Sequence, residues 1–349
     1  MIVLRSNFHY FKASAVFTAL ALAAAWGVGM QYGQSMTAAL GTVFIVMVLA
    51  VLEISLSFDN AVVNAKVLQD MDPVWQRRFI TWGIAIAVFG MRIIFPLLIV
   101  GLMADISPWQ ALVLAAVQPD EYARVMVSAH VSIAAFGGSF LAMVGLKYFF
   151  DVKKDVHWVR SIEEPLTKLG KIEAVEIALV LVTLYAITRA LPEAVRLGFL
   201  LSGMLGLVTF VVVGGIGALM GAGKDHVRAT AKSGFASFLY LEVLDASFSF
   251  DGVIGAFALT HNLFVIALGL GIGAMFVRSL TIMLVDKGTL AEYRYLEHGA
   301  FWAILALAAL MLAGSVIHIP EVVTGLIGAV LIGLSFISSV RLNQRQDKY

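Results

Sequence analysis

Two acidic segments lie inside the apolar stretches of this chain, and each contains the tripeptide Ser-Phe-Asp. In the first segment Glu53 lies six residues before Asp59. In the second, Asp245 lies six residues before Asp251, so the spacing is the same. An ionised carboxylate at bilayer depth costs about 2.5–3.5 kcal/mol or more, and such acids usually mark a functional site. Because the chain carries this pattern twice, we predict that the acids form a functional site.

The polar side chains of the two segments offer oxygen donors: carboxylates, a carboxamide and hydroxyls. These hard donors suit Mg²⁺, Ca²⁺ and Mn²⁺, whereas soft copper sites favour cysteine or methionine. Several acids in one site of low dielectric constant repel one another unless a divalent cation or protons neutralise them. The sequence therefore predicts a metal site, a proton site, or both in alternation. The predicted metal ligands are Glu53, Asp59, Asn60, Glu242, Asp245 and Asp251.

Two arginines inside apolar stretches, Arg92 and Arg278, are candidate counter-ions for these acids. The alternative interpretation is that the acids are structural, each neutralised by one of these arginines and by serine or asparagine partners. The histidines at the ends of the apolar stretches, among them His298, are predicted to be wet interfacial residues rather than ligands.

A regular helix does not gather all the acids on one face. With about 100° per residue, Glu53, Ser57, Asn60 and Asn64 form one polar stripe, and Asp59 lies about 120° away from it. A local break would let the acids converge, and discontinuous helices are a recurring device of cation transporters.

The residues that follow the two aspartates suit such breaks, because glycine and asparagine tolerate unusual backbone angles. We therefore expect interrupted helices near Asp59–Asn60 and near Asp251–Gly252.

The composition is that of a polytopic membrane protein. The chain has 349 residues, of which 60% are hydrophobic and only 13% charged, about half the roughly 25% charged residues of soluble domains. A net charge of +1 gives no sign of nucleic-acid binding, and the absence of cysteine excludes disulfides and thiolate chemistry. The expected partners are the lipid bilayer, a metal ion and protons.

About ten apolar stretches are long enough to cross a bilayer, which takes about 20 residues. We expect an all-α polytopic membrane protein with one transmembrane helix in each stretch. The ten predicted spans are residues 11–30, 38–66, 79–104, 127–150, 173–190, 196–222, 232–260, 262–285, 298–318 and 321–340.

Lysine and arginine predict the orientation. With the N-terminus inside, 18 of the 24 basic residues lie in inner segments and three, Arg124, Arg189 and Arg196, in outer ones. Such a bias is typical of cytoplasmic loops. We expect an integral protein of a bacterial inner (plasma) membrane with both termini in the cytoplasm.

The two acidic segments lie in the second and seventh predicted spans, so they run in opposite directions. The simplest organisation is two inverted five-helix repeats, residues 1–190 with spans 1–5 and residues 191–349 with spans 6–10. Inverted repeats are a common transporter plan, with the site at the midplane between the repeats.

The acidic segments resemble two motifs of the TerC family of integral membrane proteins, in the LysE-type superfamily. The early Glu-x-x-Leu-Ser-x-Asp-Asn motif is matched throughout, and the later Glu-x-x-Asp-x-x-Phe-x-x-Asp-Ser motif at all but its last position, where Gly252 replaces serine. The resemblance covers about residues 38–285 and is closest to a branch labelled as a domain of unknown function. The matching residues are Glu53, Leu56, Ser57, Asp59, Asn60, Glu242, Asp245, Phe248 and Asp251.

The TerC family is associated with tellurite resistance and, for several members, with manganese export. The resemblance therefore implies a secondary transporter that exports a divalent cation, Mn²⁺ in the first place, with no permanently bound cofactor and no enzymatic activity. The alternative is a non-transporting membrane scaffold in a metal or tellurite stress response. An intramembrane aspartyl protease that uses Asp59 and Asp251 is disfavoured, because the Gly-x-Gly-Asp pattern of those enzymes is absent.

Overall fold

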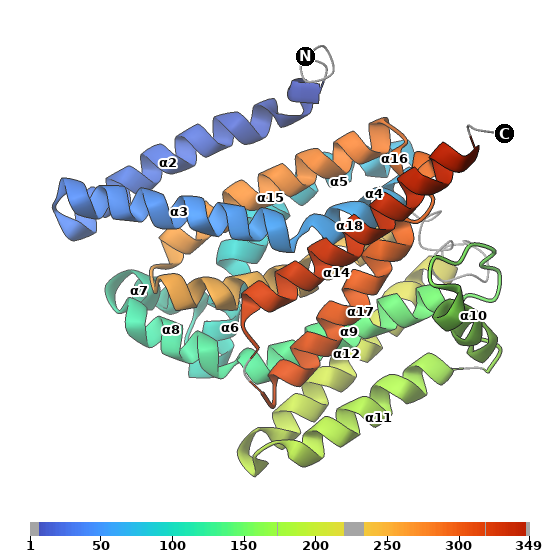
Figure 1. Ribbon diagram of the computed structural model, residues 1–349. Coiled ribbons are helices and arrows are strands. Elements are labelled where there is room, and N and C mark those ends of the chain that lie inside the picture. The colour runs from blue at the N-terminus through green and yellow to red at the C-terminus, as the bar shows by residue number, and fades with distance from the viewer. Residues whose placement is uncertain (1–6, 173, 220–233, 318, 347–349) are drawn as a thin grey trace. The chain divides into compact units, whose positions relative to one another are not determined.

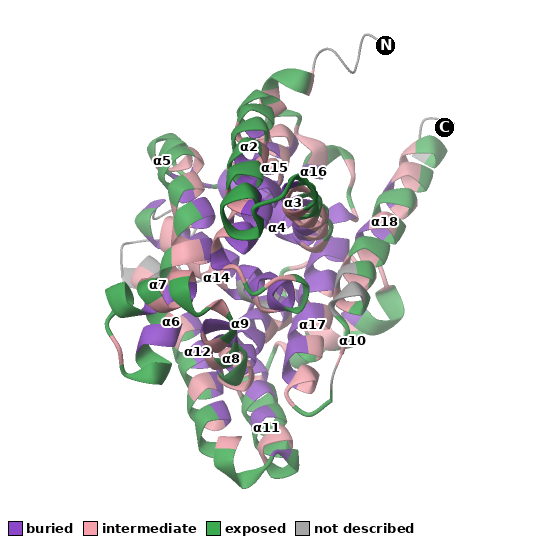
Figure 2. Ribbon diagram, turned by 90° about the vertical axis from the view of Figure 1, so that its left-hand side faces the viewer, coloured by how far each residue is buried: buried purple, intermediate pink, exposed green. Residues whose placement is uncertain are grey.

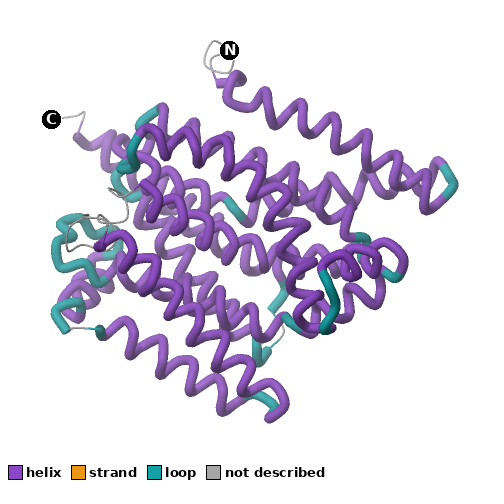
Figure 3. The backbone as a smooth tube through the Cα atoms, turned by 180° about the vertical axis from the view of Figure 1, so that it is seen from behind, coloured by secondary structure: helices purple, strands orange, loops and turns teal. Residues whose placement is uncertain are grey.

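The computed structural model describes residues 7–172, 174–219, 234–317 and 319–346 (Figure 1). Every regular element in these ranges is helical, and they contain no strand (Figure 3). The predicted all-α class is confirmed. In chain order the helices are η1 (Phe8–Phe11), α2 (Lys12–Gly33), α3 (Met36–Leu56), α4 (Phe58–Gln69), α5 (Pro73–Ala85), the π-helix η2 (Ile86–Ile94), α6 (Phe95–Ala104), α7 (Pro108–Val117), α8 (Pro119–Ser128), α9 (His130–Phe149), α10 (Arg160–Leu169), α11 (Val175–Ala190), α12 (Glu193–Leu219), α14 (Gly234–Leu259), α15 (Leu263–Asp286), α16 (Thr289–Glu292), α17 (Leu296–Gly314) and α18 (Glu321–Gln346).

Within the described ranges, eight helices are long and apolar enough to cross a membrane. The other two predicted spans also form helices. Of these, α11 has 16 residues, fewer than the roughly 20 that a bilayer requires. Helix α14 has 26 residues but carries three acids, Glu242, Asp245 and Asp251. By these helices the chain is an integral membrane protein, and its described residues contain eight such spans where the sequence predicted ten.

The chain forms two compact units, and each draws segments from both of the predicted halves. The division into two inverted repeats stays a prediction. Unit 1 comprises Met1–Ser57, Arg77–His130 and Phe248–Met283, and unit 2 comprises Phe58–Gln76, Val131–Ser247 and Leu284–Tyr349.

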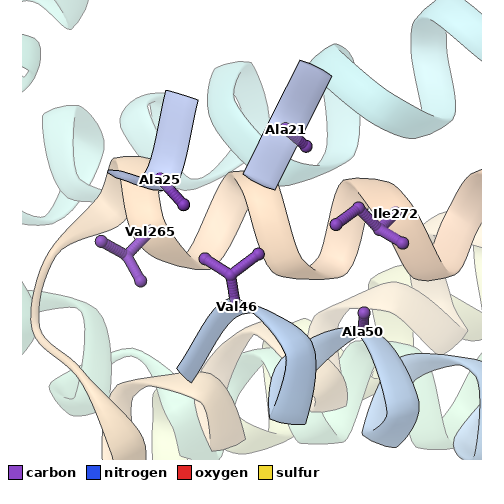
Figure 4. Packing of buried hydrophobic residues seen from close by; sticks show 6 residues of the cluster. All are labelled: Ala21, Ala25, Val46, Ala50, Val265 and Ile272. Atoms are coloured by element: carbon purple, nitrogen blue, oxygen red, sulfur yellow. The ribbon is translucent and has the colours of Figure 1, made fainter. Parts of the chain in front are cut away.

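Small side chains hold unit 1 together. Helices α2 and α3 pack as a hairpin, and a Cβ added at Gly29 would lie 2.6 Å from the Cα of Ala39. Such close approach is typical of helices packed in a membrane, where small residues replace the hydrophobic effect as the basis of association. The buried cluster that joins this hairpin to α15 contains Ala21, Ala25, Val46, Ala50, Val265 and Ile272 (Figure 4).

In unit 2, α17 packs against α4, α9 and α18. A Cβ added at Gly138 or Gly145 of α9 would lie 2.8 or 2.5 Å from leucine side chains of α17. The rings of Tyr148 and Phe301 stack with their centroids 3.8 Å apart. Helices α11 and α12 expose many large apolar side chains, and Figure 2 shows exposed residues along α11. Apolar faces of this extent are expected of helices that contact lipid.

Candidate functional site

The first acidic segment interrupts its helix, as predicted. Helix α3 ends at Leu56 and α4 begins at Phe58, while Ser57 lies between them with φ −106° and ψ 17°. The break falls two residues before Asp59, which lies in the first turn of α4. Asp59 is therefore presented by a helix start rather than by the middle of a regular helix.

The second predicted interruption is wrong, because α14 runs without a break through Asp251 and Gly252. The glycine serves a different purpose. A Cβ added at Gly252 would lie 2.9 Å from Oε2 of Glu53. Glycine thus lets the backbone of α14 approach the Glu53 carboxylate closely, and a helical glycine needs no break to do so.

Glu53 forms a buried salt bridge with Arg92 inside unit 1. The exposed fractions of the two side chains are 2% and 6%. Nη2 of Arg92 donates to Oε1 of Glu53, and the hydroxyl of Ser57 donates to the same oxygen at 3.3 Å. Nη1 of Arg92 donates to the carbonyl oxygen of Ala87 at 2.7 Å. The predicted counter-ion role of Arg92 therefore has a specific partner.

Arg92 lies in a π-helical segment, η2, which the sequence did not predict. The segment spans Ile86–Ile94, and the N–H of Phe95 bonds to the carbonyl oxygen of Gly90, five residues earlier. Segments of this kind are rare and frequently occur at functional sites. The extra residue in the turn changes the direction of every side chain that follows it.

The second candidate counter-ion, Arg278, is also buried. Its guanidinium carbon lies 3.8 Å from the centroid of the Phe79 ring. An arginine this close to an aromatic face gains a cation–π attraction, which is stronger when the pair is desolvated. The structure places Arg278 in the interior of unit 1 rather than at a wet helix end.

In unit 2, Asn64 joins α4 to α14. Its Nδ2 donates to Oδ1 of Asp245 at 2.7 Å, and both residues are buried. Asn64 belongs to the polar stripe of the sequence but was not among the predicted ligands. The spacing of four residues from Asn60 was the signal that could have found it, since residues four apart share one face of a helix.

Asp59 and Asn60 are buried at the start of α4. Oδ1 of Asp59 accepts the backbone N–H of Asn60 at 2.9 Å. The carboxamide oxygens of Asn60 and Asn64 have no hydrogen-bond partner among the described residues. Buried acceptors are nearly always satisfied in proteins. Two of them on one helix face are therefore candidate cation ligands.

The six predicted ligands are divided between the units. Glu53 and Asp251 belong to unit 1, and the other four belong to unit 2. The side chain of Asp251 lies outside the described part of the chain. Glu242 is buried on α14, three residues before Asp245. Among the described residues no group of three Asp, Glu or His side chains is close enough to hold a metal ion, so the six-residue site stays a prediction.

Unit 2 contains a second polar centre, which the sequence did not predict. Glu163 on α10 is completely buried. Burial alone raises its pKa, but the hydrogen bond and charge of His298 and the charge of Lys154 outweigh it and hold the pKa of Glu163 well below its usual range. Glu163 accepts from Nζ of Lys154 at 3.1 Å, Nδ1 of His298 at 2.9 Å, Nε1 of Trp302 at 3.1 Å and the backbone N–H groups of Trp158 and Val159 at 3.2 Å.

This centre corrects the interpretation of His298 as a wet interfacial residue, because its side chain is 3% exposed and bonded to Glu163. The preceding residue, Glu297, lies 3.0 Å from Nζ of Lys66 at the end of α4. Two successive residues of α17 thus hold α10 and α4. Burial lowers the pKa of Lys154, although its ion pair with Glu163 opposes that shift.

A family model described as "Protein of unknown function (DUF475)" matches residues 58–346. The chain belongs to the DUF475 family. The match begins just before Asp59 and includes all of α14, whereas Glu53 precedes it. No curated protein and no solved structure matches the chain. The predicted relation to a family of unknown function is confirmed, and the resemblance to TerC stays a prediction.

Proposed function

We propose that this DUF475 protein is a secondary transporter that exports a divalent metal cation, most readily Mn²⁺. The observation that carries the proposal is the set of buried oxygen atoms on α4 and α14 of unit 2. It consists of Asp59, Asn60, Asn64 and Asp245, which are buried among apolar residues of the two helices.

The chemistry of these donors favours a hard cation. Carboxylate and carboxamide oxygens suit Mg²⁺, Ca²⁺ and Mn²⁺ better than copper or zinc. The resemblance of the acidic motifs to TerC adds the preference for manganese. Glu242 is a further candidate ligand on α14, and the role of Asp251 stays a prediction.

The bond between Asn64 and Asp245 supports this proposal by orienting the carboxamide. Because Nδ2 of Asn64 is committed to Asp245, its Oδ1 points away from that carboxylate. The same Oδ1 has no donor among the residues that the structure describes. A cation would supply the missing partner, and it would offset the cost of burying the acids without water.

Protons would compete with the metal for the same acids. Asp59 and Asp245 bind a proton or a divalent cation, so an inward proton gradient would drive metal out. We therefore expect export to depend on the pH difference across the membrane.

The test of substrate identity is the metal content of cells, measured element by element, with and without the protein. Cells that produce the Asp59→Asn variant at the same level are the control. The proposal expects a selective fall in manganese that the variant does not cause. Unchanged manganese with metal-dependent capture of a protein partner would favour the scaffold instead.

A further inference from the structure

The salt bridge between Glu53 and Arg92 is neutral and fully enclosed in unit 1. A buried acid needs a compensating charge, and in the proposed transporter the metal or protons supply it for Asp59 and Asp245. For Glu53 the chain itself supplies that charge. Breaking such a pair by removing one partner is strongly destabilising, because it leaves an uncompensated buried charge.

Two glycines fit the backbone closely around Glu53. A Cβ added at Gly273 of α15 would lie 2.4 Å from Cβ and Cγ of Glu53. A Cβ added at Gly252 of α14 would lie 2.9 Å from Oε2. Contacts below 3 Å require an atom to move, which is costly at Cβ and Cγ and cheaper at Oε2, the end of the side chain. Gly273 therefore leaves the room that the base of the Glu53 side chain needs.

The π-helical segment directs Arg92 toward Glu53. One guanidinium nitrogen donates to Ala87 of the same segment, and another donates to Glu53. A residue removed from a helix rotates every later side chain by about 100°. The π-helical register is therefore what lets Arg92 reach Glu53 while it remains bonded to Ala87.

Glu53 in turn holds Ser57, where α3 ends. The carbonyl oxygen of Glu53 accepts the N–H of Ser57 at 3.0 Å, and its carboxylate accepts the Ser57 hydroxyl. Ser57 directly precedes α4, which carries Asp59 in its first turn. Fixing Glu53 therefore fixes the residue from which α4 departs.

We propose that Glu53 and Arg92 are a positioning pair that sets the break at Ser57, and that Glu53 does not bind the transported cation. This inference rests on the proposed function and narrows it. The oxygen atoms that bind the cation then come from α4 and α14. Arg92 neutralises the charge of Glu53, as the cation neutralises the charge of the other acids.

The test compares four proteins in proteoliposomes: wild type, Glu53→Gln, Arg92→Gln and the double variant that carries both changes. The double variant restores neutrality without restoring a carboxylate. We expect each single variant to raise the KM for Mn²⁺, per folded molecule, by about tenfold. The double variant should return it to within about threefold of wild type, since coupled residues are not additive.

Three results would overturn the inference. A folded double variant as impaired as Glu53→Gln would mean that the carboxylate acts on the cation itself. Single variants with an unchanged KM would mean that the pair positions nothing. The third result would be a loss of thermal stability in the double variant equal to the sum of the losses in the two single variants, which would mean that the two residues are not coupled. The exposed pair Glu121 and Arg124, substituted in the same way, is the matched control and should leave both readouts unchanged.

The stability measurement also separates this inference from the proposed function. If wild type transports no Mn²⁺, the proposed function fails, yet the unfolding temperatures still report on the pair. Recovery of stability in the double variant would support the pairing, and its absence would overturn it.

Discussion

Asn64 donates a hydrogen bond from Nδ2 to Oδ1 of Asp245 at 2.7 Å, across 181 residues of sequence. This bond connects the helix that follows the break at Ser57 with the helix of the second acidic motif. It orients the carboxamide of Asn64 and engages one oxygen of Asp245. In the proposed transporter, one side chain would therefore both bind the cation and hold α4 to α14.

The substitution Asn64→Ala tests this link. It removes a hydrogen-bond donor from the buried carboxylate of Asp245 and should lower the free energy of unfolding by about 1–3 kcal/mol. Transport of Mn²⁺ should fall as well, because the proposed ligand Oδ1 is lost. Unfolding in detergent and flux in vesicles measure the two effects. The control is Asn343→Ala, which removes an exposed amide that bonds to the carbonyl oxygen of Glu292; equal effects of the two substitutions would contradict the proposal.

Gly252→Ala tests why α14 carries glycine directly after its aspartate. The new Cβ would lie 2.9 Å from Oε2 of Glu53. Because Arg92 holds this carboxylate in place, we expect a loss of about 1 kcal/mol from the overpacking. Gly27→Ala in α2 is the matched change, because an added Cβ there meets no atom within 4 Å. Thermal unfolding should distinguish the two variants. A Gly252→Ala protein as stable as wild type would show that α14 does not need glycine at this contact with Glu53.

Glu163 and Glu164 are neighbours in sequence, but we expect their substitution to change the free energy of unfolding by very different amounts. Glu163→Gln leaves Lys154 buried without its carboxylate and should cost about 3–5 kcal/mol. Glu164→Gln breaks an exposed pair with Arg160 and should cost less than about 1 kcal/mol. Chemical unfolding measures both. Similar values would show that the Glu163 centre does not anchor the segment between α9 and α11.

The depressed pKa of Glu163 also predicts a pH dependence. Its folded pKa lies below the unfolded value of 4.5, so the stability that this group contributes is present above pH 4.5 and is lost as the pH falls toward the folded pKa. Wild type should therefore lose more stability than Glu163→Gln when the pH is lowered from 6 to about 3. Parallel curves for the two proteins would mean that Glu163 titrates normally.

The sequence predicted the fold class and an interrupted helix near Asp59–Asn60, and the break lies at Ser57. Both predictions follow from local composition. Acids in an apolar run require a special arrangement, and Asp59 lay off the polar stripe. The prediction of a second break was wrong because a glycine after an aspartate can either end a helix or allow another group to approach the backbone closely. Gly252 allows close approach to Glu53, a contact that depends on residues about 200 positions away in the chain.

The remaining site features depend on tertiary contacts that no local pattern encodes. The π-helical register of Arg92 is visible only from its bonds to Ala87 and Glu53. Glu163 lies in a charged segment that reads as a solvated loop. Its burial depends on partners far away in the chain, such as His298, which lies 135 residues later and bonds to it.

Cation transport through the buried acids is tested by Mn²⁺ flux into proteoliposomes that contain equal amounts of folded wild type, Asp59→Asn or Asp245→Asn. An exposed acid, Asp120, provides the control variant Asp120→Asn. We predict saturable flux in wild type and in the control, and a fall of about tenfold or more in both buried-acid variants. Equal flux in all four proteins, or none in wild type, would contradict this prediction.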